Sequence, residues 1–250
     1  MKRTVVMAVV VGLVASLSLA QVTSVNAVGI VKRNVEAQKL TFGAFNFDPV
    51  NADETAGVPL AEVLGDQLTA GNTFLRADNV IIWDIANQRY ITFFKFMDGN
   101  WRNSENFGQT ATNIMYNGDA FWIVSHQGAD QEITFSGEVV DIPGKTNEMT
   151  FAVGLNMFGY PYPAELPLND TGLYDAANKG TTFLTGDNVI VWDQANQQYV
   201  TYFAFLGTAD WRNKDNMGQS GDFPLGLGTG YWYVRRNTIG TWAETQPYVL

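Results

Sequence analysis

Two loops of the same composition hold the residues best suited to bind a ligand. The motif Trp-Arg-Asn-x-x-Asn-x-Gly-Gln occurs at 101–109 and again at 211–219. A flat indole stacks on the apolar face of a sugar, and arginine and amide side chains hydrogen-bond to hydroxyls. The sequence therefore predicts a candidate carbohydrate site in each loop. The residues are Trp101, Arg102, Asn103, Asn106 and Gln109 in the first loop and Trp211, Arg212, Asn213, Asn216 and Gln219 in the second.

The same loops also have a purely structural interpretation. Each arginine would pair with a nearby aspartate, and each tryptophan would plug the end of a β-sandwich. Large aromatic residues are usually well buried, and these loops repeat together with the fold, which favours this alternative. Exposed indoles would indicate sugar binding, whereas buried indoles would argue against it.

No residue pattern predicts catalysis or a metal site. His126 is the only histidine, so neither a His-rich zinc site nor a Ser–His–Asp set is indicated. Asp170-Thr171-Gly172 matches an aspartic-protease tripeptide, but the first half lacks a counterpart and a turn is expected. The oxygen-rich run at 48–54 lacks the spacing and glycine of an EF-hand and is expected to be a solvated loop. With no cysteine for disulfides or thiolate ligands, we expect no cofactor.

The positions of these residues depend on a module that occurs twice. The segment DNVIIWD at 78–84 matches DNVIVWD at 187–193, an offset of 187 minus 78, or 109 residues. After one inserted residue the offset becomes 110, and the two Trp-Arg-Asn loops match at that spacing. Self-similarity of this extent indicates two copies of one structural unit.

Each module is expected to consist of strands joined by turns. The β-branched run 80–83, the turn formers at 84–88 and the apolar run 90–96 predict a hairpin. Apolar residues on both faces of 90–96 predict an interior strand. The Trp-Asp pair at the turn is interpreted as a buried tryptophan before a turn-initiating aspartate, since propeller blades recur every ~40–45 residues. A further strand is expected at 121–124 and a short helix at 59–68, weakened by a glycine.

One strand type occurs three times for two modules. It is found at Ile30-Val31, Val139-Val140 and Val249-Leu250. We expect the middle strand to close the first module and open the second, so that the terminal strands are free edges or pair with each other. Unpaired edges favour association with another chain, which makes a homo-oligomer a further hypothesis.

The first 27 residues are typical of a signal peptide. Two basic residues precede the apolar run 4–19, and the segment ends Ser24-Val25-Asn26-Ala27, which fits cleavage after Ala27. An uncleaved anchor is the competing interpretation, but the run is shorter than the ~20 residues that span a bilayer. No other stretch predicts a membrane span. We therefore expect an exported protein, whether periplasmic, on the cell surface or extracellular.

The charge balance bears on the choice of partner. The chain has 25 acidic and 15 basic residues, and removal of Lys2 and Arg3 leaves 13 basic residues and a net charge of −12. An acidic surface repels phosphate backbones, so nucleic acid is not expected as a partner.

The predicted fold class is all-β, with two tandem duplicated β-sandwich-like modules after an N-terminal signal peptide. The expected boundaries are 1–27 for the signal peptide, 28–142 for the first module and 143–250 for the second.

The strands 117–124, 133–139 and 228–234 carry a resemblance to known sequences. Together with the Val-x-x-Trp-Asp hairpin, they resemble a diffuse set of uncharacterised exported bacterial β-repeat proteins with a Gly-x-Gly-Phe-Trp-Val strand. In the first copy, Asp119-Ala120 replaces the small residue and glycine of that pattern. The resemblance implies a β-repeat fold and brings no catalytic residues.

These observations favour a non-enzymatic structural or adhesive protein that self-associates through its terminal strands. The alternative is a carbohydrate-binding protein that uses both Trp-Arg-Asn loops, with two sites giving avidity. A secreted hydrolase is the least favoured hypothesis, because the two halves differ in loop length and not in clustered acid–base groups.

Overall fold

The computed structural model describes residues 27–50, 57–139, 142 and 144–248. The predicted signal peptide up to residue 26, most of the oxygen-rich run and the expected strand at 249–250 lie outside the described residues. Within the described part of the chain, no helix combines the length and apolar character needed to cross a membrane.

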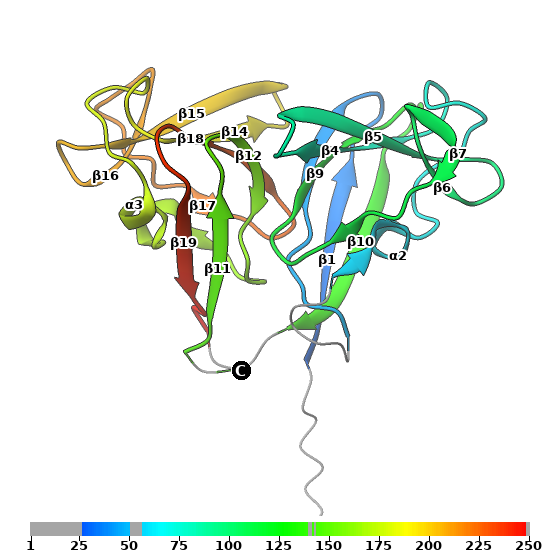
Figure 1. The fold of residues 1–250 in the computed structure, drawn as a ribbon, viewed down its shortest axis with the longest axis horizontal. Helices are drawn as coiled ribbons and strands as arrows, with labels where there is room; N and C mark the ends of the chain where they lie inside the picture. Colours follow the sequence, from blue (N-terminus) through cyan, green and yellow to red (C-terminus); the bar gives the residue numbers. More distant parts are fainter. Residues whose placement is uncertain (1–26, 51–56, 140–141, 143, 249–250) are drawn as a thin grey trace, which may run out of the picture.

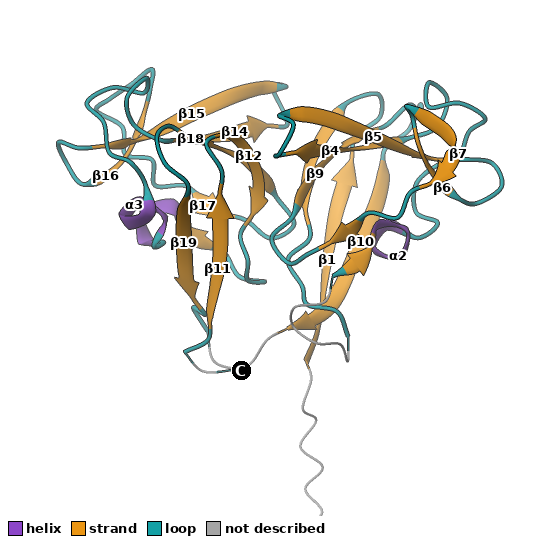
Figure 2. Cartoon of the chain, viewed as in Figure 1, coloured by secondary structure: helices purple, strands orange, loops and turns teal. Residues whose placement is uncertain are grey.

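Antiparallel strands are the main regular structure of the described chain, which confirms the predicted all-β class (Figure 2). The first half contains β1 (Ala27–Val35), β2 (Leu40–Ala44), β3 (Val58–Pro59), α2 (Leu60–Leu64), β4 (Asn79–Asp84), β5 (Arg89–Lys95), β6 (Trp101–Asn103), β7 (Asn106–Thr110), β8 (Ile114–Met115), β9 (Ala120–Val124) and β10 (Gln131–Val139). The second half contains β11 (Thr146–Phe151), β12 (Gly154–Gly159), β13 (Leu166–Pro167), the 3₁₀ helix η1 (Leu168–Asp170), α3 (Leu173–Ala176), β14 (Asn188–Asp193), β15 (Gln198–Phe205), β16 (Asp210–Asn213), β17 (Pro224–Leu225), β18 (Gly230–Arg235) and β19 (Gly240–Thr245).

The main sheets of the two halves share one strand order. The first half has a six-stranded sheet in the order β2-β9-β4-β5-β6-β7, and the second has a five-stranded sheet in the order β12-β18-β14-β15-β16. The ribbons β1–β10 and β11–β19 lie beneath these sheets (Figure 1). Each half therefore has two layers, the main sheet and a two-stranded ribbon. The second layer is narrower than the second sheet of a β-sandwich. That the halves arose by duplication stays an inference from the sequence.

The expected sharing of the middle strand between the modules is wrong. β1 pairs along its whole length with β10, from Ala27 opposite Val139 to Val35 opposite Gln131. The second half opens with a strand of its own, β11, which pairs with β19. Ile30-Val31 and Val139 are alike in residue type because they lie in the two partner strands of one ribbon, and not at equivalent positions of two modules. Among the described strands, no surplus edge is left over from the repeat.

The core of each half lies between its sheet and its ribbon. In the first half, strand alternation turns Val80, Phe93 and Phe121 downwards, where they pack with Phe135 of the ribbon. The short helix α2 covers the side of this core. It is shorter than the predicted 59–68, because the chain leaves the helix at Gly65 with a φ of +50°, a conformation that suits glycine.

Candidate binding site

The turns of the β4–β5 and β14–β15 hairpins lie where the two halves meet (Figure 1). Asp84 accepts hydrogen bonds from the backbone and side-chain amides of Asn87. Asp193 accepts the same pair of hydrogen bonds from Asn196. These bonds close each turn, which confirms the prediction of a turn-initiating aspartate.

The tryptophan before each aspartate reaches across the junction to the other half. Trp83 Nε1 donates to the carbonyl oxygen of Leu155 at 2.8 Å, and Trp192 Nε1 donates to that of Leu40 at 3.3 Å. Both indoles are half-buried, and they pack at the junction instead of in the core of their own half. The two contacts are reciprocal, so the junction has approximate twofold symmetry.

Two glutamines add a second reciprocal contact. The side-chain amide of Gln88 accepts from the backbone amide of Leu155 at 2.9 Å and donates to its carbonyl at 3.1 Å. Gln197 makes the same pair of bonds with Leu40, at 3.4 Å each. Each hairpin therefore binds both backbone groups of one residue on the edge strand of the opposite half. These contacts fix how the two sheets face one another.

An apolar cluster fills the junction beneath the hairpins. The rings of Phe42 and Trp122 stack with centroids 4.1 Å apart. Across the junction, Trp83 packs edge-on against Trp232 at 5.3 Å, and Trp192 packs against Trp122 in the same way at 5.2 Å. The buried members are Phe42, Ala44, Ala120, Trp122, Met157 and Trp232, with Leu40, Ile81, Trp83, Leu155, Ile190 and Trp192 around them.

Two matching hollows open on the solvent side of this cluster. Their volumes are about 350 Å³ and about 330 Å³, at the lower end of the range for small-ligand sites. Each is lined by a tryptophan, an isoleucine, a leucine and a threonine of one half, and by the same two tyrosines, one from each half. The first is lined by Tyr90, Leu155, Ile190, Tyr199, Thr201 and Trp232, and the second by Leu40, Ile81, Tyr90, Thr92, Trp122 and Tyr199. We call the two hollows together the trough.

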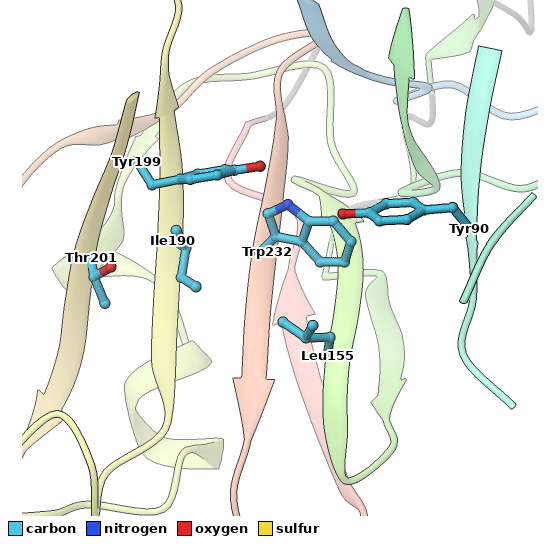
Figure 3. A pocket seen from close by; sticks show the side chains of 6 residues that line it. All are labelled: Tyr90, Leu155, Ile190, Tyr199, Thr201 and Trp232. Atoms are coloured by element: carbon cyan, nitrogen blue, oxygen red, sulfur yellow. The ribbon is translucent and has the colours of Figure 1, made fainter. Parts of the chain in front are cut away.

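Tyr90 and Tyr199 are the side chains that the two hollows share. They extend towards each other from β5 and β15, with Trp232 between them (Figure 3). The Tyr90 ring lies 6.1 Å from that of Trp232, and the Tyr199 ring lies 6.4 Å from that of Trp122. Both tyrosines are half exposed, at 49% and 50%, whereas the two tryptophans are buried. The tyrosines therefore form walls and the tryptophans form floors.

The trough is apolar and uncharged, with hydroxyl groups at its rim. None of the residues that line its two hollows carries a formal charge at neutral pH. Partial burial raises the pKa of Tyr90, and the nearby Tyr199 raises it further. Burial also raises the pKa of Tyr199. A side-chain hydrogen bond with Trp232 lowers this pKa, but its effect is the smaller of the two. Both phenols therefore stay protonated at neutral pH, and a neutral ligand with alternating apolar faces and hydroxyls fits this lining.

The predicted loop site lies elsewhere, and its two tryptophans are unavailable for stacking. Trp101 and Trp211 are 2% and 0% exposed and pack into the cores of their halves. The stacking part of the prediction is therefore wrong, because each tryptophan lies in a strand of the main sheet and turns its indole towards the core. Trp101 begins β6, and Trp211 lies in β16.

The arginines of these segments match the structural alternative. Arg102 forms an ion pair with Asp98 and lies 4.1 Å from the centroid of the Phe96 ring. Arg212 pairs with Asp210 at 2.8 Å. Both arginines also donate to carbonyls within their own segment.

The amide side chains of the same segments are partly used within the turns. The carboxamide oxygens of Asn103 and Asn213 accept hydrogen bonds from backbone amides two residues later. The remaining four are exposed, and ligand binding by them stays a prediction. They are Asn106, Gln109, Asn216 and Gln219.

The other sequence motifs have structural partners. His126 Nε2 lies 3.0 Å from the side-chain amide of Asn79. Asp170 ends η1, and the hydroxyl of Thr171 donates to the carbonyl of Leu168, which confirms the expected turn. Asp48 binds the Asn117 amide at 3.0 Å. No group of three or more histidine, cysteine, aspartate or glutamate side chains is arranged to hold a metal within the described ranges.

Sequence reasoning missed the trough because its residues come from both halves. Tyr90 and Tyr199 are matched in the repeat, but the apolar pattern of 90–96 predicts burial on both faces. Phe93 and Phe94 are indeed buried, whereas the strand starts at the junction, where Tyr90 remains half exposed. The signal available in the sequence was a matched pair of tyrosines beside the turn of a repeated hairpin.

Comparisons of the chain with protein-family models, with curated proteins and with solved structures found no match.

Proposed function

We propose that this is an exported, non-enzymatic adhesive protein that binds a neutral glycan chain in the trough. The observation that carries the proposal is the pair of matching hollows, each with a tryptophan floor and shared tyrosine walls. Sugar rings present apolar faces and hydroxyl edges, and aromatic side chains with a polar tip complement both. The predicted signal peptide supports export.

The shared walls favour one chain over two separate ligands. A glycan lying along the trough would pass from one hollow to the other between Tyr90 and Tyr199, which line both. Contacts in both hollows then act on one ligand, and the second contact benefits from a high effective concentration. The uncharged lining favours neutral polysaccharides over acidic ones.

The proposal is tested with Tyr90→Ala and Tyr199→Ala in a glycan-array or affinity-electrophoresis experiment on neutral polysaccharides. Each substitution removes a wall of both hollows, so each is expected to weaken binding about two- to tenfold, in line with an aromatic stacking contact. Both side chains are half exposed, and the unfolding midpoint is expected to stay close to that of the wild type.

Arg102→Ala and Arg212→Ala serve as controls, because these side chains lie in the predicted loop segments and do not line the trough. They are expected to leave glycan binding unchanged. If they abolish binding while the tyrosine variants retain it, the ligand site belongs to the loops. If the wild type binds none of the neutral glycans, the proposed function is wrong.

A further inference from the structure

Four surface positions are apolar in both halves of the chain. They match at offsets of 109 residues for the first three and 110 for the last. The residue type changes at two of the positions, but each stays large and apolar. The pairs are Phe74 with Phe183, Leu75 with Leu184, Met97 with Leu206, and Phe107 with Met217. We call the set in the first half the first tip and the set in the second half the second tip.

The tips protrude into solvent. Leu75 and Met97 are 68% and 71% exposed, and Leu184 and Leu206 are 65% and 62% exposed. Single exposed apolar residues are ordinary, but clusters of them mark interaction sites. Matched exposure and retained apolar character in both halves indicate that these side chains meet the same kind of partner.

Each tip is held by the main sheet of its half. In the first half, Gly71 forms a β-bridge with Phe96, which fixes the loop that carries Phe74 and Leu75 beside Met97. Gly180 forms the same bridge with Phe205 in the second half. The bridges bring together two segments that are distant in the sequence, so each tip is a defined surface feature.

Both tips lie on the face of the sheets that carries the trough. Side chains of β5 alternate, so Phe94 lies on the same face as Tyr90. The Phe94 ring is 5.6 Å from that of Phe107, which is 6.4 Å from that of Phe74. Six residues of extended chain separate Tyr90 from Phe96, or about 20 Å. Figure 1 shows the loops of the first tip (cyan) and the second (yellow) at opposite upper ends of the molecule.

We propose that the two tips insert into a lipid surface of low charge. The tips protrude, and none of their residues lines the trough. A protruding apolar side chain needs a partner surface that can receive it. A lipid layer deforms around such side chains and needs no matching groove. The ion pairs Arg102–Asp98 and Arg212–Asp210 beside the tips add no net charge. One further arginine lies at each tip and suits a headgroup phosphate: exposed Arg76 follows Leu75, and Arg236 donates to the carbonyl of Phe183. The chain carries a net charge of −10, which opposes binding to an anionic surface. These charges favour a zwitterionic bilayer.

The proposal does not depend on glycan binding. If both are correct, the trough faces the headgroup layer, and its ligand is a glycan carried by the membrane. Two tips at opposite ends of one face also predict avidity, since insertion of the first holds the second near the surface.

The test is flotation of the chain from Val28 onwards with phosphatidylcholine vesicles. The variants are Leu75→Ser/Met97→Ser for the first tip, Leu184→Ser/Leu206→Ser for the second, and the combination of all four. The combined variant is expected to lose about tenfold or more in vesicle partitioning, and each single-tip variant is expected to lose part of that, because both tips contribute buried apolar area. Addition of phosphatidylglycerol to the vesicles is expected to weaken binding at low salt.

The matched control is Ile30→Ser/Ile239→Ser, which removes two side chains that are 66% and 68% exposed and lie outside the tips. It is expected to partition like the wild type. The proposal is wrong if the wild type does not float with the vesicles, or if the control loses as much binding as the tip variants. It is also wrong if light scattering shows a lipid-free oligomer that the tip variants dissociate, because a second copy would then cover the tips. Unchanged soluble-glycan binding by the tip variants separates this result from failure of the proposed function.

Discussion

Asp119 gives the stability of the protein a defined dependence on pH. It lies in the turn before β9, where its carboxylate accepts a hydrogen bond from the backbone amide of Tyr116 at 2.8 Å. Burial raises the pKa of this carboxyl to about 6, and the hydrogen bond opposes the shift in part. Between the ordinary aspartate pKa of about 4 and this raised value, the folded chain binds more protons than the unfolded chain.

The contribution of Asp119 to the free energy of unfolding should therefore be complete below about pH 4 and fall as the pH rises through about 6. Asp119→Asn removes this titration and keeps an acceptor for the Tyr116 amide. We expect the stability of the variant relative to the wild type to increase from pH 4 to pH 7 in urea unfolding. A difference that stays flat, or that falls with pH, would contradict the raised pKa.

Individual residue roles followed from the sequence where the chemistry was local. The hydrogen bonds of Asp84 and Asp193 need only the next few residues, and the turn was predicted correctly. The indoles of Trp101 and Trp211 were harder to place, because a tryptophan beside polar residues fits both an open binding loop and a strand that faces the core. The sequence contains nothing local that distinguishes these two environments.

At the scale of elements, the β1–β10 ribbon supports the core of the first half. Val31 and Val35 of β1 are buried, opposite Phe135 and Gln131 of β10. Deletion of 28–35 would expose Phe135 and remove almost all of the ladder, so we expect it to destabilise the first half instead of producing a folded monomer. Thermal unfolding followed by circular dichroism should show a lower midpoint or a lost transition. A deletion variant with the wild-type transition would contradict this role.

The strands themselves were largely predictable, but their partners were not. Alternating and β-branched runs predicted the β4–β5 hairpin and the β9 strand, because period-2 patterns reflect the two faces of one strand. The pairing of β1 with β10 joins segments about a hundred residues apart and is set by the packing of Val31 and Phe135. Such long-range pairing leaves no mark on either strand alone.

At the scale of the whole molecule, the junction should couple the unfolding of the two halves. Phe42 is 1% exposed, stacks on Trp122, and lies 5.9 Å from Trp232 of the other half. Phe42→Ala is expected to cost about 3–5 kcal/mol, the usual loss for a buried phenylalanine. It should also separate a single calorimetric transition into two, because the halves would then unfold independently. One unchanged transition would show that the junction does not couple them.

The trough could not be predicted, because it exists only after the two halves meet. Its walls and floors come from β5 and β9 of one half and from β15 and β18 of the other, with a leucine from each edge strand. The repeat predicted two equivalent modules and therefore two equivalent sites, one per module. The structure instead places two apolar hollows where the halves meet, and each is completed by a tyrosine of the opposite half.

The reciprocal contacts of Gln88 with Leu155 and of Gln197 with Leu40 have a consequence for the ancestry of the chain. In a symmetric dimer, one surface patch contacts its own copy, so each subunit makes the same contacts to the other. The junction has this form, because each half makes the same contacts to the other half. Under the duplication inferred from the sequence, a shorter ancestor with a single module would have assembled this arrangement from two separate chains. On the same inference, joining them end to end would have allowed the halves to diverge. Arg235, which pairs with Asp187 where the first half has Ser125, would then be one product of that divergence.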